Sequence, residues 1–156
     1  MITPAEHSLP VRRKYYMVAD AASGLLLLLF LYTALSKLAG YQSFTIALKS
    51  VPVIYPYAGV VAWLLPAVEL IIALLLFFRD TRQPGLYASL VALLAFTGYL
   101  LYMIAYIPDL PCNCGGVLSS LSWKQHIFFN LLFIIINILG LWSYTKIKYS
   151  KKRIPP

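Results

Sequence analysis

Residues 86–107 read LYASLVALLAFTGYLLYMIAYI, a stretch that contains no charged side chain. A helix needs about 20 predominantly apolar residues to cross the hydrocarbon core of a bilayer. Three more segments of similar length and strongly apolar character lie at residues 17–38, 57–78 and 126–144. All four are continuously apolar, whereas membrane strands would alternate between apolar and polar residues. The sequence therefore predicts an all-α membrane protein, built as a four-transmembrane-helix bundle.

The composition agrees with a surface that faces lipid. Hydrophobic residues make up 61% of the 156 residues, charged residues only 12%, and the mean hydropathy is +0.78. A soluble domain carries roughly 25% charged residues, so this chain has too few for a water-exposed surface. We interpret residues 1–156 as a single integral membrane domain. The net charge of +8 does not indicate nucleic-acid binding, because the basic residues lie at the ends of apolar segments.

The segments between the predicted helices differ in length. They are a long loop at residues 40–56, a tight turn at 79–85, a second long loop at 108–124 and a basic tail at 145–156. Within the first loop, residues 44–49 are expected to form a short interfacial helix. Basic residues 12–14 precede the first apolar segment, as they would in a signal peptide. That segment is long and no small-x-small cleavage site follows it, so we interpret it as a retained helix.

Basic residues divide unequally between the two sides of the predicted bundle, ten against three. The larger group is Arg12, Arg13, Lys14, Arg79, Arg82, Lys146, Lys148, Lys151, Lys152 and Arg153, and the smaller is Lys37, Lys49 and Lys124. The positive-inside rule then places both termini in the cytoplasm and both long loops outside. We expect a multi-pass protein of the bacterial inner (cytoplasmic) membrane, with its long loops facing the periplasm.

The second long loop contains the only two cysteines, Cys112 and Cys114, separated by one residue and followed by Gly115 and Gly116. A disulfide between them would close a very small and strained ring, and strain makes a disulfide easier to reduce. The glycines can adopt the backbone angles that such a ring requires. The predicted compartment also permits disulfides. These features favour a redox-active pair.

Other interpretations of the cysteines stay open. A permanent structural disulfide is weakly supported, because closing so short a loop removes little chain entropy. Inert thiols and soft-metal binding are alternatives, although two sulfurs and His126 would make an incomplete zinc site. One pair stores at most two electrons, so no relay within the chain is possible. A thiol protein must serve one half of the cycle, and a second protein, a membrane quinone or a small oxidant the other.

Two polar residues near the start of the fourth segment are further candidates. His126 and Asn130 are four residues apart and share one face of that helix. His126 lies close in sequence to the cysteines, so it or Lys124 could lower the pKa of a thiol. The alternative is that His126 caps or anchors the helix. Asn137 is expected to form interhelical hydrogen bonds.

Glu69 lies near the middle of the second segment, three residues after Pro66. A charge at this depth costs about 2.5–3.5 kcal/mol on insertion scales. Glu69 must therefore be protonated, paired or in a wet cavity. It could handle protons for thiol chemistry, or it could be a packing residue paired with a group such as Lys37. Lys37, near the end of the first segment, is expected to reach the membrane interface by snorkelling.

Several motifs together resemble a known superfamily. Residues 34–38 (ALSKL) and 66–70 (PAVEL) are similar to helix motifs of the DoxX superfamily. Residues 112–116 (CNCGG), followed by residues 121–126 (LSWKQH) and Asn130, resemble its MauE-like branch. Phosphate-binding glycine loops, metalloprotease helix motifs and serine-nucleophile elbows are absent from the sequence. The sequence therefore contains no motif that indicates hydrolase or nucleotide-driven activity.

The resemblance implies a four-helix membrane bundle in a redox-associated family. Its methylamine-utilisation members are implicated in maturing a disulfide-rich periplasmic dehydrogenase subunit, alongside a thioredoxin-like partner. By carry-over, Cys112 and Cys114 are the thiol pair, and Lys37 and Glu69 occupy family positions without a known role. The partner is then a periplasmic thioredoxin-like or disulfide-containing protein.

Taken together, the residues favour an inner-membrane thiol–disulfide redox protein. Cys112, Cys114, His126 and Glu69 are its candidate catalytic residues, and a membrane quinone is a candidate electron acceptor. The first rival is a non-enzymatic scaffold for a partner complex, in which the cysteines only shape the loop. The second rival is a protein that handles copper or a small molecule.

Overall fold

The computed structural model describes residues 4–106 and 123–152, and gives side-chain positions for residues 13–106 and 125–148. All regular secondary structure in these ranges is helical. The elements are α1 (Pro4–Ala39), α2 (Tyr41–Lys49), the 3-10 helix η1 (Tyr55–Tyr57), α3 (Ala58–Phe77), α4 (Arg82–Tyr106) and α5 (Trp123–Lys152). The all-α class predicted from the sequence is confirmed.

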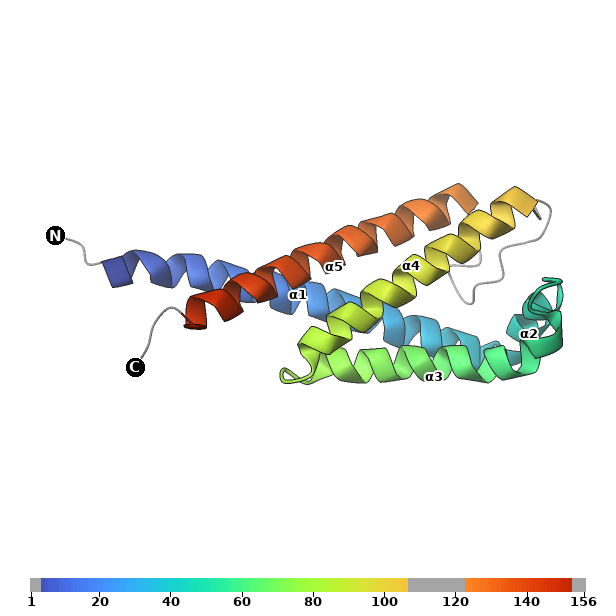
Figure 1. Ribbon diagram of the computed structural model, residues 1–156. Coiled ribbons are helices and arrows are strands. Elements are labelled where there is room, and N and C mark those ends of the chain that lie inside the picture. The colour runs from blue at the N-terminus through green and yellow to red at the C-terminus, as the bar shows by residue number, and fades with distance from the viewer. Residues whose placement is uncertain (1–3, 107–122, 153–156) are drawn as a thin grey trace.

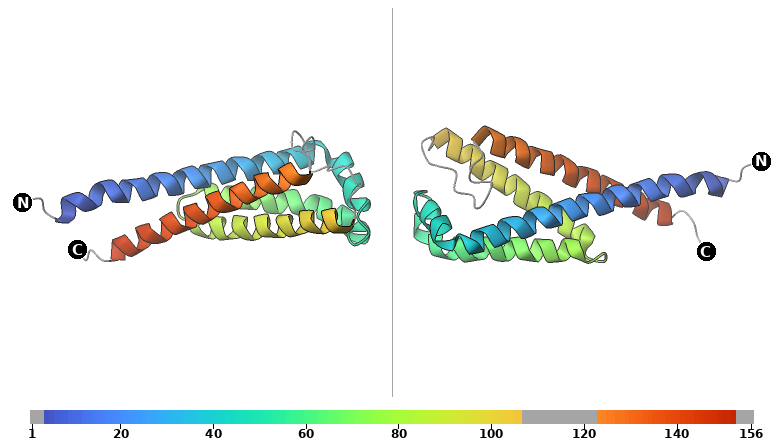
Figure 2. Two further views of the ribbon diagram at one scale, coloured as in Figure 1. Left: turned by 90° about the horizontal axis from the view of Figure 1, so that it is seen from above. Right: turned by 180° about the vertical axis from the view of Figure 1, so that it is seen from behind.

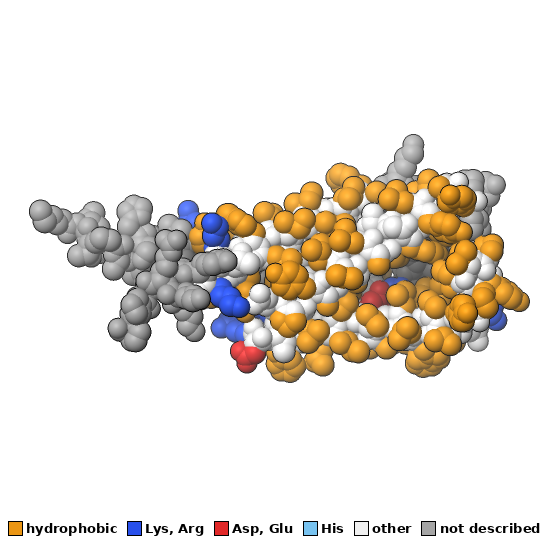
Figure 3. Space-filling model, viewed as in Figure 1, with side chains coloured by type: hydrophobic (Ala, Val, Ile, Leu, Met, Phe, Trp, Pro, Cys, Tyr) orange, Lys and Arg blue, Asp and Glu red, His pale blue; other side chains and the backbone are white. Residues whose placement is uncertain are grey.

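Four stretches of helix are long and apolar enough to cross a membrane. They are Arg13–Ala39, Tyr55–Phe77, Arg82–Tyr106 and Gln125–Lys148. Only 22–33% of each stretch is buried inside the protein, so most of its apolar side chains point outward, as the largely hydrophobic surface in Figure 3 shows. A surface of this kind is stable only when lipid covers it. The chain is therefore a multi-pass membrane protein.

The helices form two neighbouring pairs. Helix α1 lies beside α3, α4 lies beside α5, and α1 also crosses α5 (Figures 1 and 2). The start of α1 and the end of α5 lie at one end of the bundle, here named the terminal end. Helix α2, the end of α4 and the start of α5 lie at the opposite end, named the α2 end. Helices α3 and α4 meet near their connecting turn and separate toward the α2 end (Figure 1).

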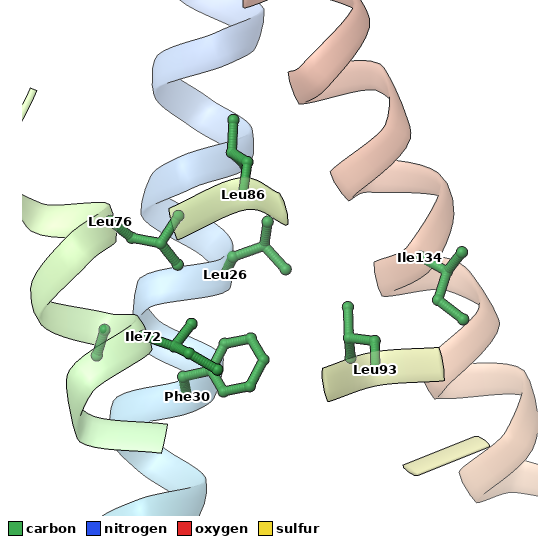
Figure 4. Close-up of a cluster of buried hydrophobic side chains, with 8 residues drawn as sticks. Leu26, Phe30, Ile72, Leu76, Leu86, Leu93 and Ile134 are labelled. Carbon is green, nitrogen blue, oxygen red and sulfur yellow. The ribbon is translucent and has the colours of Figure 1, made fainter. Parts of the chain in front are cut away.

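Apolar side chains from all four spanning helices form the main core. Leu86 of α4 lies beside Leu26 of α1 and Leu76 of α3, and Leu93 of α4 lies on the side of Ile134 of α5 (Figure 4). Its buried members are Leu26, Phe30, Ile72, Ala73, Leu76, Leu86, Leu93 and Ile134. The side chains are mostly branched, and they fill the space between helices that cross at an angle. This cluster joins the two helix pairs.

Helix α2 packs on the outer end of α3. Phe44 and Leu48 are buried against Ala58 and Ala62, and the rings of Tyr41 and Trp63 lie 5.4 Å apart. The short helix predicted at residues 44–49 therefore forms, but it begins at Tyr41. Small alanine side chains on α3 leave the room that this short helix needs.

Three of the spanning helices extend well beyond the predicted segments. Helix α5 continues through Lys152, where a tail beginning at residue 145 was expected, because that stretch contains four lysines, which favour helix, and no proline. Helix α4 begins at Arg82, so Pro84 lies inside its first turn. Proline is tolerated there because the first backbone N–H groups have no partner within the helix. Helix α1 begins at Pro4, well before residue 17.

Basic side chains gather at the terminal end, where Figure 3 shows most of the described Lys and Arg side chains. The members of this group within the described side chains are Arg13, Lys14, Arg79, Arg82, Lys146 and Lys148. Lys49 lies at the α2 end instead, at the end of α2. The bundle therefore has one strongly basic end, in agreement with the charge asymmetry of the sequence.

Replacing Gly140 with alanine should destabilise the bundle. A Cβ atom at Gly140 would lie 2.9 Å from the Cβ of Ala22, so α1 and α5 would have to move apart. Overpacking of this kind costs about 1–3 kcal/mol. Gly98→Ala is the matched control, because a Cβ there meets nothing within 4 Å. Thermal unfolding in detergent should show a lower Tm for Gly140→Ala and an unchanged or higher Tm for Gly98→Ala. Equal Tm values would contradict the close α1–α5 contact.

Candidate functional site

An ion pair joins the last turn of α1 to α3. The Nζ atom of Lys37 donates a hydrogen bond to Oε1 of Glu69 over 2.7 Å, and a longer one to the carbonyl of Thr33 over 3.4 Å. The two side chains are 6% and 13% exposed, respectively. The sequence left open whether Glu69 is paired, and the structure shows that Lys37 is its partner.

The Lys37 side chain points along α1 toward the middle of the bundle. Its ammonium bonds to the carbonyl of Thr33, one turn earlier in the helix, and the ring of Phe44 lies 6.0 Å from it on the side of α2. The expectation that Lys37 snorkels outward to the interface is therefore wrong. A carboxylate within reach provides better compensation for the ammonium than a path to water that α2 partly covers.

This ion pair lies within the apolar part of two spanning segments. Figure 3 shows acidic and basic atoms in a recess midway along an otherwise hydrophobic face. Removing both charges from water is costly, and close pairing offsets that cost only when the remaining polar atoms are also satisfied. Oε2 of Glu69 is buried, and no hydrogen-bond partner for it occurs among the described residues. The pair is therefore compensated in charge but incompletely hydrogen-bonded.

A second ion pair lies at the terminal end. Arg82 of α4 contacts Asp20 of α1, whose side chain is 48% exposed. Exposed pairs contribute little, typically 0–1 kcal/mol in general. This pair joins α1 to α4 near solvent. Its contribution to stability can therefore be compared with that of the buried pair, which also includes a residue of α1.

The predicted residues His126 and Asn130 lie in the α4–α5 interface. His126 is 2% exposed, and its ring packs edge-on against Phe96 with 5.5 Å between centroids. The amide of Asn130 donates to the carbonyl of Leu93 over 3.1 Å and to the hydroxyl of Thr97 over 2.6 Å. These contacts bind the first turns of α5 to the second half of α4.

A second polar contact follows two turns along the same interface. Asn137 is fully buried and donates to the hydroxyl of Ser89 over 2.6 Å, which confirms its predicted role in interhelical hydrogen bonding. The partners Ser89 and Thr97 were not singled out from the sequence. Their spacing could have indicated this pairing. Ser89 and Thr97 are eight residues apart on α4, and Asn130 and Asn137 are seven apart on α5, which runs antiparallel to it.

The candidate residues therefore belong to two interfaces. Lys37 and Glu69 join α1 to α3, whereas His126 and Asn130 face α4. The cysteine pair, Cys112 and Cys114, lies outside the described residues, in the segment that connects α4 to α5. Within the described part of the chain, no group of three or more His, Cys, Asp or Glu side chains could hold a metal ion.

Comparison with known proteins identifies one family. The family model described as "Methylamine utilisation protein MauE" matches residues 15–143. This range includes the second and third membrane-spanning stretches whole, all but the first two residues of Arg13–Ala39 and all but the last five of Gln125–Lys148, and it covers the cysteine segment. No curated protein and no solved structure matches the chain.

Breaking the buried ion pair one side at a time should cost more than removing it whole. Lys37→Met and Glu69→Leu should each destabilise the protein by about 3–5 kcal/mol, because each leaves a buried charge without its partner. The double variant should cost less than the sum. Asp20→Asn, Arg82→Gln and their double variant form the control cycle, with coupling below about 1 kcal/mol. Reversible unfolding in detergent measures both cycles. Additive costs for Lys37 and Glu69 would contradict a coupled pair.

Replacing Asn130 with leucine should loosen the α4–α5 contact. The change removes both interhelical bonds of its amide, and hydrogen bonds of this kind contribute on average about 0.6 kcal/mol each in membrane proteins. A moderate loss of unfolding free energy, near 1–2 kcal/mol in total, is expected in the same unfolding assay. Thr97→Val, which removes one acceptor and keeps the shape, should lose less than Asn130→Leu. A larger loss for Thr97→Val would show that the hydroxyl has another function.

Proposed function

The chain belongs to the MauE family, and from this we propose that it is an inner-membrane thiol–disulfide redox protein. It supports disulfide formation or maturation of periplasmic partner proteins. The observation that carries the proposal is the position of the two cysteines. Cys112 and Cys114 are the only cysteines of the chain and lie within the part that matches the family. A single pair separated by one residue suits thiol–disulfide exchange better than a structural role.

The exchange proceeds through a mixed disulfide. The thiolate of one cysteine attacks a partner disulfide, a new S–S bond forms to one partner sulfur, and the other partner sulfur leaves as a thiolate that takes up a proton. The second cysteine then attacks the mixed disulfide and releases the second partner thiol. Two electrons have passed to the partner, and the Cys112–Cys114 pair is oxidised. In reverse, the same steps oxidise a partner dithiol. Cys114 is the proposed attacking residue, because it adjoins two glycines, which have no side chain to hinder the approach of a partner.

Two described side chains are proposed to assist. His126 lies in the first turn of α5, close in sequence to the cysteines, and an imidazole near a thiol raises its thiolate fraction. Glu69 is proposed to handle protons, supported by its place in the span and by its free carboxylate oxygen among the described residues. Both roles depend on how the cysteine segment lies against the bundle.

The orientation follows from charge. The basic terminal end is proposed to face the cytoplasm, by the positive-inside rule. The connection from Tyr106 to Trp123 begins and ends at the α2 end, so the cysteines would face the periplasm. A thioredoxin-like protein or another disulfide-containing protein is the proposed partner there. The pair must then be restored by a second thiol protein, a membrane quinone or a small oxidant.

One observation favours a different class of function. Polar side-chain pairs in the described spans join two helices of the bundle, as Asn130–Thr97 and Asn137–Ser89 do. A membrane scaffold for a partner complex would need only such contacts. If a Cys112→Ser/Cys114→Ser double variant still matured its partner protein in cells, this scaffold function would replace the redox function.

A redox titration of the purified protein in lipid tests the proposal directly. Thiol alkylation and the resulting mass shift report the fraction of oxidised cysteines at each potential. We expect a reversible two-electron transition between about −120 and −270 mV, the range of known exchange proteins. A disulfide that resists reduction below about −300 mV would indicate a structural link instead. Cysteines that stay reduced under every oxidant would also overturn the redox function.

A further inference from the structure

We propose that the recess around Lys37 and Glu69 binds the head group of a lipid-soluble quinone. Such a quinone would be the redox partner that restores the cysteine pair, so its purpose rests on the function proposed above. The site itself consists of described side chains from α1, α2 and α3. Its hydrogen-bonding capacity, its access from lipid and its charge all indicate this class of ligand.

The ion pair has unused hydrogen-bonding capacity on both partners. An ammonium carries three N–H donors, and Lys37 has two acceptors among the described residues, Oε1 of Glu69 and the carbonyl of Thr33. Oε2 of Glu69 is buried and has no hydrogen bond within the same part of the chain, although the hydroxyl of Thr33 also lies near this carboxylate. One donor and one acceptor therefore lie side by side. A quinone oxygen can accept from Lys37, and the hydroxyl of the reduced quinol can donate to Glu69.

Access to this pair is from the hydrocarbon region. Both residues belong to stretches that are long and apolar enough to span a membrane, and Figure 3 shows the recess on an outward, hydrophobic face. Outward-facing neighbours on α3 are apolar, with Val68 40% and Leu64 57% exposed. A ligand that reaches the recess by this route must dissolve in lipid. Water-soluble metabolites do not meet that requirement.

The charge and the lining of the recess further restrict the class of ligand that it can bind. The ammonium and the carboxylate neutralise each other, so the recess offers no net charge to attract a phosphate or a carboxylate. A neutral head group with carbonyl or hydroxyl oxygens suits it better. The ring of Phe44, 6.0 Å from the Lys37 ammonium, provides an apolar wall on the side of α2. Aromatic rings favour stacked or edge-on contact with another ring.

The redox step balances with this ligand. Two cysteine thiols lose two protons and two electrons as their S–S bond forms. The quinone gains two electrons and two protons, and its two carbonyl oxygens become hydroxyl groups. Glu69 is a carboxylate in the ion pair, so it must first take up one of the protons that the thiols release, and it can then pass that proton to the oxygen that Lys37 holds. Lys37 would thereby hold the quinone oxygen, and Glu69 would transfer the proton to it.

Quenching of tryptophan fluorescence by decylubiquinone tests the site in the full-length protein in phosphatidylcholine nanodiscs. Trp63 of α3 is a reporter on the helix that carries Glu69. Saturable quenching is expected, with affinity lower by at least about tenfold in Glu69→Gln and in Lys37→Gln, because each loses a charged hydrogen-bonding group. Asp20→Asn is the matched control, since it alters the other ion pair of α1, and it should bind as the unaltered protein does.

Two further variants separate the possible outcomes. Lys37→Gln/Glu69→Gln leaves two neutral amides that can bond to each other, so it should fold even if the single variants do not, and it should lose binding. Cys112→Ser/Cys114→Ser should keep binding unchanged. Quenching that is not saturable, or equal affinity in the double Gln variant, would overturn the quinone site. Binding that persists while the cysteines prove inert in the titration would retain the site and remove the thiol function.

Discussion

The absence of water from the hydrocarbon core is the constraint on which this structure depends. Backbone groups that cannot bond to water must bond within their own segment, so the spanning segments are helices. Apolar side chains have no reason to avoid lipid, and most of those on α1, α3, α4 and α5 accordingly face outward. The helices are then joined by a limited apolar core and by polar side chains that bond to one another and to backbone carbonyls.

The polar contacts are distributed in a way that gives the two helix pairs different properties. The α4–α5 pair is held by two neutral contacts, Asn130 with Thr97 and Asn137 with Ser89, and its helices also meet through Phe96 and His126. The α1–α3 pair has a charged contact, Lys37 with Glu69. Neutral hydrogen bonds contribute modest stability. A buried ion pair is poor evidence for stability, and its presence in a membrane span is more readily explained by function.

This distribution relates the bundle to the chemistry proposed for it. The cysteine segment connects α4 to α5 at the α2 end, and α2 covers the ion pair from the same end. Helices α3 and α4 separate in that direction (Figure 1). The two residues that flank the cysteine segment, Tyr106 and Trp123, and the α2 side of the recess therefore lie toward the same end of the bundle. That arrangement suits transfer of electrons between a periplasmic protein and a ligand dissolved in lipid.

The sequence by itself determined the helical class and the number of spanning segments, because hydrophobic length is a local property of the chain. It also identified Glu69, His126, Asn130 and Asn137, since a polar residue in an apolar run is visible without any structure. Only the tertiary structure decided their partners. Lys37 turned inward to Glu69, 32 residues away, and Thr97 and Ser89 became acceptors for asparagines 33 and 48 residues away. Such pairings depend on how helices cross, which periodicity within one helix does not specify.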